Sequence, residues 1–209
     1  MLKKFYETKI LPKLLNSGMK RDVLGKYRPE VIQDVSGDVL EIGFGSGLNL
    51  SYYKSVNKLY ALEPSQELFD LTDKDLKESL FPIVHLKSGA ENIQLPDNSV
   101  DSVVSTWVLC SVENVQEVLQ EVKRVLRSGG KFFFIEHGKS NSNSLQIIQK
   151  AVTPCTRYFA GNCHLNRDIQ AEFEKAGFVI DNLKQEPMKN KGLMFLSWGV
   201  AHARKGIYD

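Results

Sequence analysis

Short apolar runs alternate with amphipathic helical patterns along most of this chain. Runs rich in Val, Ile, Leu and Phe predict strands, and the stretches between them repeat apolar residues at a spacing of three and four, which is typical of helices. The expected strands are 39–43, 58–63, 83–87, 100–106, 131–136, 178–185 and 193–203. The expected helices are 48–54, 66–80, 115–126 and 169–176.

This alternation predicts an α/β protein with one mostly parallel sheet and helices on both faces. Residues 187–192 join the last two expected strands and are too few for a helical crossover, so these two strands should pair antiparallel. Gly129 and Gly130 should end the third expected helix before the fifth strand. Residues 138–168 interrupt the alternation near the carboxyl edge of the sheet. We therefore expect a domain at 37–209 that carries a substrate-facing insertion at 138–168, preceded by a helical cap at 1–36.

The composition is that of one ordinary globular domain. The chain has 209 residues, 42% hydrophobic and 25% charged, and its net charge of +2 does not favour a nucleic-acid partner. The three cysteines form no CxxC pair, which favours reduced thiols over a disulfide framework. No apolar run approaches the length of a membrane span, and the Lys-rich start lacks the apolar centre of a signal peptide. We expect a cytoplasmic monomer.

The first residues form an amphipathic pattern with two interpretations. Leu2, Phe5, Tyr6 and Ile10 share one helical face, which Lys3, Lys4, Lys9 and Lys13 surround, and Pro12 should break or restart the helix. The segment either caps the domain or its cofactor pocket, or makes a peripheral contact with a membrane surface.

Three glycines directly after the first expected strand carry the clearest chemical signal. Gly43, Gly45 and Gly47 permit a tight strand-to-helix turn and let a ligand lie against bare backbone. Glu63 follows Gly43 by twenty residues, where a carboxylate at the end of the next strand can accept both ribose hydroxyls. A dinucleotide fingerprint would need glycine at position 48, which is Leu48. A Tyr-x-x-x-Lys pair and a Gly-Lys-Ser/Thr loop are also absent from the sequence, so the spacing favours S-adenosylmethionine.

These motifs resemble those of class I S-adenosylmethionine-dependent methyltransferases of the type 11 group, which includes the ubiquinone and menaquinone methyltransferases. The resemblance lies in Glu41-x-Gly43-x-Gly45-x-Gly47, in 62–65, in 90–101 and in 125–130. In Ile10-Leu11-Pro12, 47–50, 136–138 and 163–167 the chain resembles bacterial relatives of the membrane-associated thiol methyltransferases of animals.

The resemblance implies a Rossmann-like fold and a pocket for S-adenosylmethionine. Glu41 and Gly43 would face the methionine amino group, Gly45, Ser46 and Gly47 would line the turn beside the ribose, and Glu63 would bind the ribose hydroxyls. Pro64, Ser65, Ala90 and Glu91 would surround the adenine, and Thr106 and Trp107 would border the transferred methyl group. Many relatives carry Asp where this chain has Gly89, so the expected adenine contact departs from the pattern there.

Candidate catalytic residues are His137, Cys110 and His164. His137 follows the fifth strand and is either a general base or a residue that orients substrate. Cys110 stands where type 11 relatives often have His, although a small buried residue is the simpler interpretation. His164 lies beside Cys163, but two adjacent ligands without a second pair predict no metal site. Asn166 is expected to cap the next helix, and Arg167 or Asp168 to pin the insertion to the core.

The resulting hypothesis is methyl transfer from S-adenosylmethionine to a small, lipophilic acceptor, with a thiol favoured. A quinone or a phospholipid amine is the alternative, and a non-catalytic cofactor-binding protein at a membrane surface is a further one. A nicotinamide-dependent oxidoreductase is disfavoured by Leu48 and the missing Tyr/Lys pair. Thr106-Trp107-Val108-Leu109 lacks the Asn/Asp-Pro-Pro-aromatic motif of nucleobase enzymes, and the Phe132–Phe134 run indicates a buried strand rather than a base-stacking platform.

Overall fold

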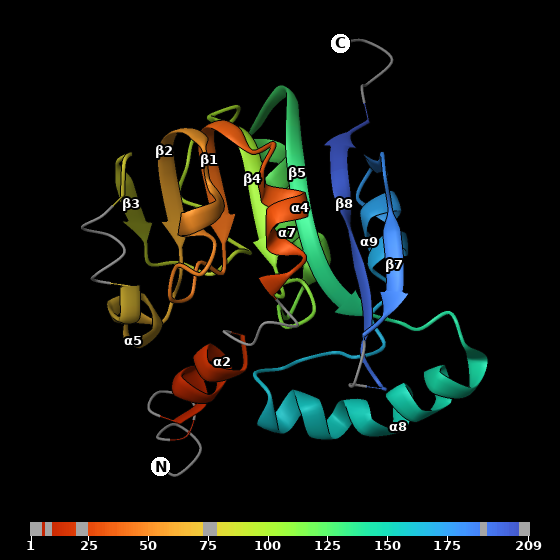
Figure 1. Ribbon diagram of the computed structural model, residues 1–209. Helices are drawn as coiled ribbons and strands as arrows, with labels where there is room; N and C mark the ends of the chain where they lie inside the picture. Colours follow the sequence, from red (N-terminus) through yellow and green to blue (C-terminus); the bar gives the residue numbers. More distant parts are fainter. Residues whose placement is uncertain (1–5, 7–9, 20–24, 73–78, 189–191, 205–209) are drawn as a thin grey trace.

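The computed structural model describes residues 6, 10–19, 25–72, 79–188 and 192–204, and every structural statement here concerns these residues. Its centre is one sheet in the order β3-β2-β1-β4-β5-β8-β6, with β7 also paired to β8 (Figure 1). The strands are β1 (Ser36–Ile42), β2 (Ser55–Leu62), β3 (Ile83–Leu86), β4 (Val100–Thr106), β5 (Leu126–Gly138), β6 (Phe178–Ile180), β7 (Lys184–Pro187) and β8 (Phe195–Ala203).

The pairing confirms a mostly parallel sheet with an antiparallel last strand. The five strands from β3 to β5 pair in parallel, whereas β8 runs antiparallel to β5 on one side and to β6 and β7 on the other. The expected strand 178–185 is divided in two by residues 181–183, where the carbonyl of Asn182 lies against Gly199. β6 and β7 thus follow one another along one edge of β8, and the sheet has seven positions.

Helices cover both faces of the sheet (Figure 1). One face carries α7 (Val115–Val125) and α9 (Ile169–Lys175), and the opposite face carries α4 (Arg28–Ile32). Side chains along β5 point alternately to the two faces of the sheet. Phe132 and Phe134 pack with α7 and α9, whereas Phe133 and Ile135 pack with α4. The three phenylalanines are at most 1% exposed, which confirms the buried strand expected there.

Two expected helices differ from the structure. The segment 48–54 contains a single 3₁₀ turn, η2 (Leu50–Tyr52), because Tyr53 adopts an extended conformation that lets its hydroxyl reach the buried Glu41. The segment 66–80 begins with α5 (Gln66–Phe69) and continues as the 3₁₀ turn η3 (Asp70–Thr72); residues 73–78 lie outside the described part.

The glycine pair before the fifth strand lies inside β5. The helix α7 ends at Val125 and Leu126 already pairs with Val100, and the next pair joins Lys131 to Ser102. Gly129 has a φ of +78° within this interruption. The two glycines therefore do not end the helix but belong to an irregularity in the strand, and the strand pairing begins five residues earlier than expected.

Two further helices, α2 (Leu11–Met19) and α8 (Asn143–Phe159), lie beyond the carboxyl ends of the parallel strands (Figure 1). Pro12 occupies the first turn of α2, where a proline costs no hydrogen bond. The hydroxyl of Tyr6 donates to the carbonyl of Phe159 at the end of α8 (2.6 Å). Leu2, Phe5, Lys3, Lys4 and Lys9 lie outside the described residues. The division into a cap, a domain and an insertion stays a prediction.

Candidate functional site

A cavity of about 360 Å³ opens at the carboxyl edge of the sheet, beneath α2 and the end of α8. A second cavity of about 350 Å³ adjoins it and shares Gly43, Pro64, Val108 and Ser111 with it. Of the residues expected to bind the cofactor, the first cavity is lined by Glu41, Gly43, Gly45, Ser46, Glu63, Pro64, Thr106 and Trp107. Ala90 and Glu91 line the second.

The glycine turn has the conformation that its spacing predicts. Gly43, Gly45 and Gly47 have φ values of +64°, +60° and +75°, which side chains rarely adopt. A Cβ atom on Gly43 would lie 2.2 Å from Cγ2 of Val108, and one on Gly47 would lie 2.5 Å from Cγ2 of Thr72. Close packing requires glycine at these two positions, whereas a Cβ atom on Gly45 would make only an ordinary contact, 3.8 Å from the carbonyl oxygen of Gly43. Gly47 itself lies outside the first cavity.

Glu63 is held in place by the turn that it faces. Its Oε2 accepts the N–H of Gly45 (2.9 Å) and its Oε1 accepts the N–H of Ser65 (2.8 Å). Burial raises the pKa of this carboxyl, and the two backbone donors partly oppose that effect. Each oxygen has a second acceptor site left for a hydroxyl group in the cavity. Ser65 does not line the first cavity; its hydroxyl accepts the N–H of Leu68 and so caps α5.

Glu41 sits at the base of the cavity and is 1% exposed. Asn49 Nδ2 donates to its Oε1 (2.8 Å) and the Tyr53 hydroxyl donates to its Oε2 (2.6 Å). Asn49 also donates to Thr106 Oγ1 (3.1 Å), which joins β1 to the end of β4. Burial raises the pKa of Glu41 to about 7, despite the hydrogen bonds and the charge of Arg28. A carboxyl poised at this value can hold a proton or bind a cation.

Arg28, which the sequence patterns did not reveal, lines the cavity together with the expected Trp107. Arg28 is 4% exposed, donates to Asn49 Oδ1, and places its guanidinium 5.2 Å from the centre of the Trp107 ring. Burial lowers the pKa of Arg28, but its charge is retained because guanidinium pKa values are so high. Trp107 has a φ of +59°, and its buried Nε1–H has no hydrogen-bond partner among the residues that the structure describes. Backbone strain and an unsatisfied donor of this kind are typical of a ligand site.

Glu136 organises the loop that follows β4. It is fully buried and accepts the Ser105 hydroxyl and the backbone N–H groups of Val108, Leu109 and Cys110, at 2.6 to 3.3 Å. Burial raises its pKa to about 7, with a further contribution from the nearby Cys110. The loop places Trp107 and Val108 in the cavity wall, so Glu136 shapes the site without lining it.

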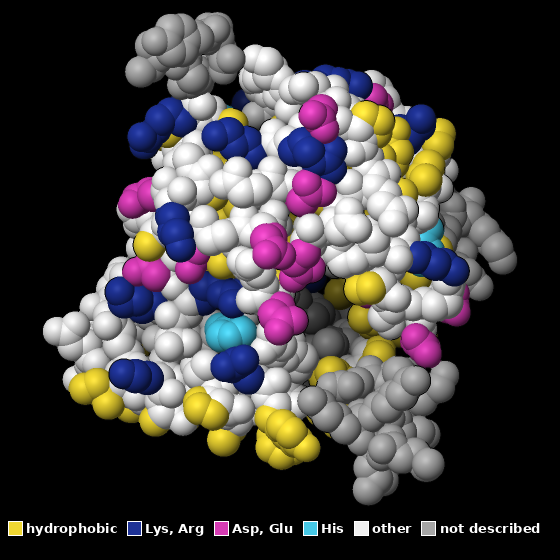
Figure 2. Space-filling model, turned by 180° about the vertical axis from the view of Figure 1, so that it is seen from behind, with side chains coloured by type: hydrophobic (Ala, Val, Ile, Leu, Met, Phe, Trp, Pro, Cys, Tyr) yellow, Lys and Arg dark blue, Asp and Glu magenta, His cyan; other side chains and the backbone are white. Residues whose placement is uncertain are grey.

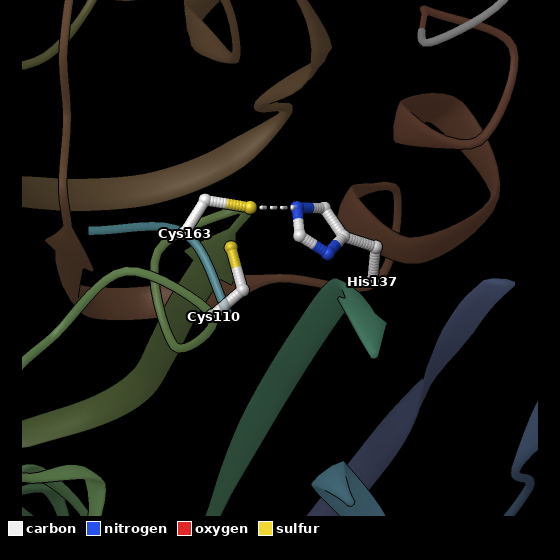
Figure 3. A group of neighbouring side chains, drawn as sticks. All are labelled: Cys110, His137 and Cys163. Carbon is white, nitrogen blue, oxygen red and sulfur yellow. Dashed lines mark hydrogen bonds between the residues drawn. The ribbon is translucent and has the colours of Figure 1, made fainter. Parts of the chain in front are cut away.

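Cys110, His137 and Cys163 come together behind this wall (Figure 3). Their side chains point toward one another, and Cys163 Sγ lies 3.3 Å from Nε2 of His137. All three are buried. The hydrogen bond from Cys163 and the charge of His137 hold the pKa of Cys110 well below its usual range, whereas the pKa of Cys163 is raised by the same bond and by burial.

The other residues singled out in 163–168 hold the insertion against the sheet. His164 does not join the cluster; its Nδ1 lies 3.2 Å from the carbonyl oxygen of Cys110. Arg167 donates to the carbonyls of Leu109 and Val112, as the expected pin. The prediction that Asn166 caps the next helix is wrong. Asp168 caps α9 by accepting the N–H of Ala171, whereas Asn166 Oδ1 accepts a hydrogen bond from the Thr153 hydroxyl (3.2 Å). Asn166 lies two residues too early to reach the first free N–H groups of the helix.

The fold and the cavity define a class. A seven-position sheet with one antiparallel strand, a glycine turn after β1 and an acid after β2 is the arrangement of class I methyltransferases. The family model described as "Methyltransferase domain" matches residues 40–134. A structure of YcgJ from Bacillus subtilis superimposes with a TM-score of 0.70 at 14% identity, over 88% of this chain and 99% of that one.

Curated relatives identify the family more closely. The thiol S-methyltransferase TMT1B of Rattus norvegicus is 35% identical over 175 residues, which cover 78% of this chain and 70% of the relative. The phosphatidylethanolamine N-methyltransferase of Cereibacter sphaeroides is 27% identical over 159 residues, which cover 75% of this chain and 76% of the relative. The chain belongs to the class I S-adenosylmethionine-dependent methyltransferase family and is an enzyme of that family.

Proposed function

We propose that this enzyme transfers the methyl group of S-adenosylmethionine to a small, lipophilic thiol. The observation that carries the proposal is the cavity itself: a mostly apolar space at the end of β4, bounded by the carboxylates of Glu41 and Glu63 and by the cation of Arg28. The 35% identity to a thiol S-methyltransferase supports the thiol over the other acceptors.

The described residues fit the methyl donor part by part. Glu41 would bind the ammonium of its methionine end, and Arg28 and the Trp107 Nε1–H would face the carboxylate of the same group. Glu63 would accept the ribose hydroxyls beside the bare backbone of Gly45. The adjoining cavity, with Ala90 and Glu91 in its wall, would receive the adenine. The Trp107 donor supports this assignment because it is buried and lacks a partner within the described part of the chain.

The titratable groups of the cavity favour an acceptor that needs no base. Among its described lining residues only Arg28, Glu41 and Glu63 titrate, and our proposal assigns all three to the methyl donor. The donor supplies an already activated methyl group when bound. The chain then has to hold the nucleophile in position and exclude water, and positioning can contribute about 7–11 kcal/mol. A thiol with a pKa of about 8.5 ionises without help, whereas a phenol or an ammonium group does so less readily.

A direct catalytic role for Cys110, His137 or His164 stays a prediction. None of the three is among the described lining residues, although Ser111, which follows Cys110 in the sequence, lines the cavity. A panel of lipophilic thiols, quinones and phosphatidylethanolamine, read by mass spectrometry, tests the acceptor. We expect methylation of thiols at a rate that rises with pH toward the thiol pKa. Turnover of the amine alone would overturn the proposal.

The Glu41 carboxyl makes a specific pH prediction. In the ligand-free protein its pKa is about 7, so it is mainly protonated at pH 6 and ionised at pH 8. Because the ammonium group favours the ionised form, affinity for S-adenosylmethionine should rise with pH by up to about tenfold per unit below 7 and level off above it. Titration calorimetry between pH 6 and pH 8 measures this affinity. Glu41→Gln should bind S-adenosylmethionine weakly at every pH, without the rise in affinity below pH 7. A dependence of affinity on pH equal to that of the wild type would contradict the assignment.

We also propose that a membrane surface delivers the acceptor through α2 and α8. No described helix is long and apolar enough to span a bilayer. Instead α8 exposes Ile147 (72%), Tyr158 (61%) and Phe159 (62%), and α2 exposes Leu14 (57%). Lys13, Lys150 and Arg157 are exposed among them and neither helix contains Asp or Glu. Hydrophobic side chains with Lys and Arg between them run along the lower edge of Figure 2. Such a surface matches an anionic bilayer.

Vesicle co-sedimentation tests this surface. Wild-type protein should sediment with vesicles that contain anionic lipid, and Ile147→Glu/Phe159→Glu should lose most of that binding while keeping its affinity for S-adenosylmethionine. Leu80→Glu is the matched control, because Leu80 is 99% exposed before β3 and away from both helices. Equal sedimentation of the two variants would show that α8 is not the contact.

A further inference from the structure

We propose that Cys110, His137 and Cys163 bind one zinc ion, which fastens the insertion to the carboxyl edge of the sheet. The three residues belong to the loop after β4, the end of β5 and the segment after α8 (Figure 3). Spacings of 27 and 26 residues along the chain gave no local motif, so the sequence did not predict this site. The proposal concerns a binding site behind the cavity wall and does not depend on the identity of the methyl acceptor.

The geometry fits a tetrahedral ion. One sulfur from each cysteine and one ring nitrogen of His137 lie within 4.8 Å of one another, and Cys163 Sγ is 3.3 Å from Nε2 of His137. Zn–S and Zn–N bonds of about 2.3 and 2.0–2.1 Å place two sulfurs about 3.8 Å apart and a sulfur and a nitrogen about 3.6 Å apart. Small side-chain shifts therefore bring all three atoms to bonding distance. Two thiolates and one neutral imidazole also cancel the charge of Zn²⁺, so the occupied site can remain buried.

The chain holds each ligand residue in place before the ion arrives. The N–H of Cys110 donates to Glu136 (3.3 Å), and its carbonyl accepts the N–H of His164 (2.8 Å). The Thr156 hydroxyl donates to the carbonyl of Cys163 (2.7 Å). His137 lies in the strand pairing of β5 with β8, opposite Leu196. Outer contacts that fix ligand orientation are a regular feature of metal sites.

Three protein ligands leave a fourth position for water or another small ligand, as in catalytic zinc sites. The soft sulfur donors favour a zinc-class ion over magnesium or calcium, which prefer oxygen ligands. The cysteines are free thiols in the structure, so no disulfide competes with this arrangement. The ion would join Cys163 to β5 and to the loop that carries Trp107 and Val108, and so would hold this part of the cavity wall in place.

The test uses the full chain, reduced and freed of metal, without methyl donor or acceptor. Zinc titrated against a chromogenic chelator should bind with one ion per chain and raise the melting temperature, and Co²⁺ should show thiolate-to-metal charge-transfer absorption. Cys110→Ser/Cys163→Ser and His137→Gln should lose at least tenfold in affinity. Cys155→Ser is the matched control, because Cys155 is exposed on α8 and lies outside the cluster.

Thiol labelling keeps the proposal testable if the cluster variants fail to fold. Cys155 should react rapidly with or without zinc, and bound zinc should slow the labelling of the buried Cys110 and Cys163 relative to the metal-free protein. Absence of zinc binding by reduced wild-type protein, equal binding by Cys110→Ser/Cys163→Ser, or Co²⁺ spectra without thiolate bands would each overturn the site. Because methyl donor and acceptor are absent, such a failure would leave the proposed methyl transfer standing.

Discussion

Glu63→Gln is expected to lower the affinity for S-adenosylmethionine about 10- to 100-fold, with the fold retained. The ionised carboxylate already orders the turn through Gly45 and Ser65, and its remaining acceptor sites would receive the ribose hydroxyls. An amide keeps the size of the side chain but loses one acceptor oxygen and its charge. Hydrogen bonds to charged groups contribute about 1.5–3 kcal/mol, which corresponds to this range.

Calorimetry with S-adenosylmethionine measures the effect, and circular dichroism checks the fold. Glu117→Gln is the matched control, since Glu117 is exposed on α7 and far from the cavity residues. It should bind as tightly as the wild type. Wild-type affinity in Glu63→Gln would show that this carboxylate does not contact the donor.

Gly43→Ala should destabilise the protein by about 2–5 kcal/mol, a large share of the roughly 5–15 kcal/mol that folds a typical domain. Two costs add. The residue has a φ of +64°, and a left-handed conformation costs an alanine about 1–2 kcal/mol. The new Cβ would also lie 2.2 Å from Val108 Cγ2, and such overpacking costs about 1–3 kcal/mol.

Gly129→Ala separates the two costs. Gly129 has a φ of +78°, but a Cβ atom added to it would meet no other atom within 4 Å, so only the backbone cost of about 1–2 kcal/mol should appear. Urea denaturation compares the two variants. Adding Val108→Ala to Gly43→Ala should recover part of the lost stability, because the clashing methyl groups are gone. Equal losses in Gly43→Ala and Gly129→Ala would show that the turn does not need close packing.

Local conformational signals in the sequence predicted the parts of the site that they govern. The turn at Gly43 to Gly47 needs positive φ values, and few residues other than glycine tolerate them, so its spacing could be read directly. The run Phe132–Phe134 could also be read directly, since a short run of consecutive apolar residues is typical of a strand covered on both faces. Glu63 was predicted from its position at the end of the second strand, whereas Glu41, Thr106 and Trp107 were predicted from the resemblance to class I methyltransferases.

Residues brought together by tertiary packing could not be predicted. Arg28 lies in a stretch without a clear pattern, and nothing in the sequence indicates that α4 would direct it to Trp107. Gln149 is fully buried in α8 and bonds to the carbonyls of Gly138 and Leu193, although the sequence suggests only a polar helix position. Cys110, His137 and Cys163 meet through three separate elements, and their spacing carries no sign of that contact.

A crystal structure with S-adenosylhomocysteine bound would decide whether the cavity is the methyl-donor pocket. We predict that the amino group of the ligand lies against Glu41, its carboxylate faces Arg28 and Trp107, and its ribose hydroxyls reach Glu63, with the adenine between Pro64 and Ala90. Ligand density in another part of the molecule, or a ribose that does not contact Glu63, would contradict the proposed pocket.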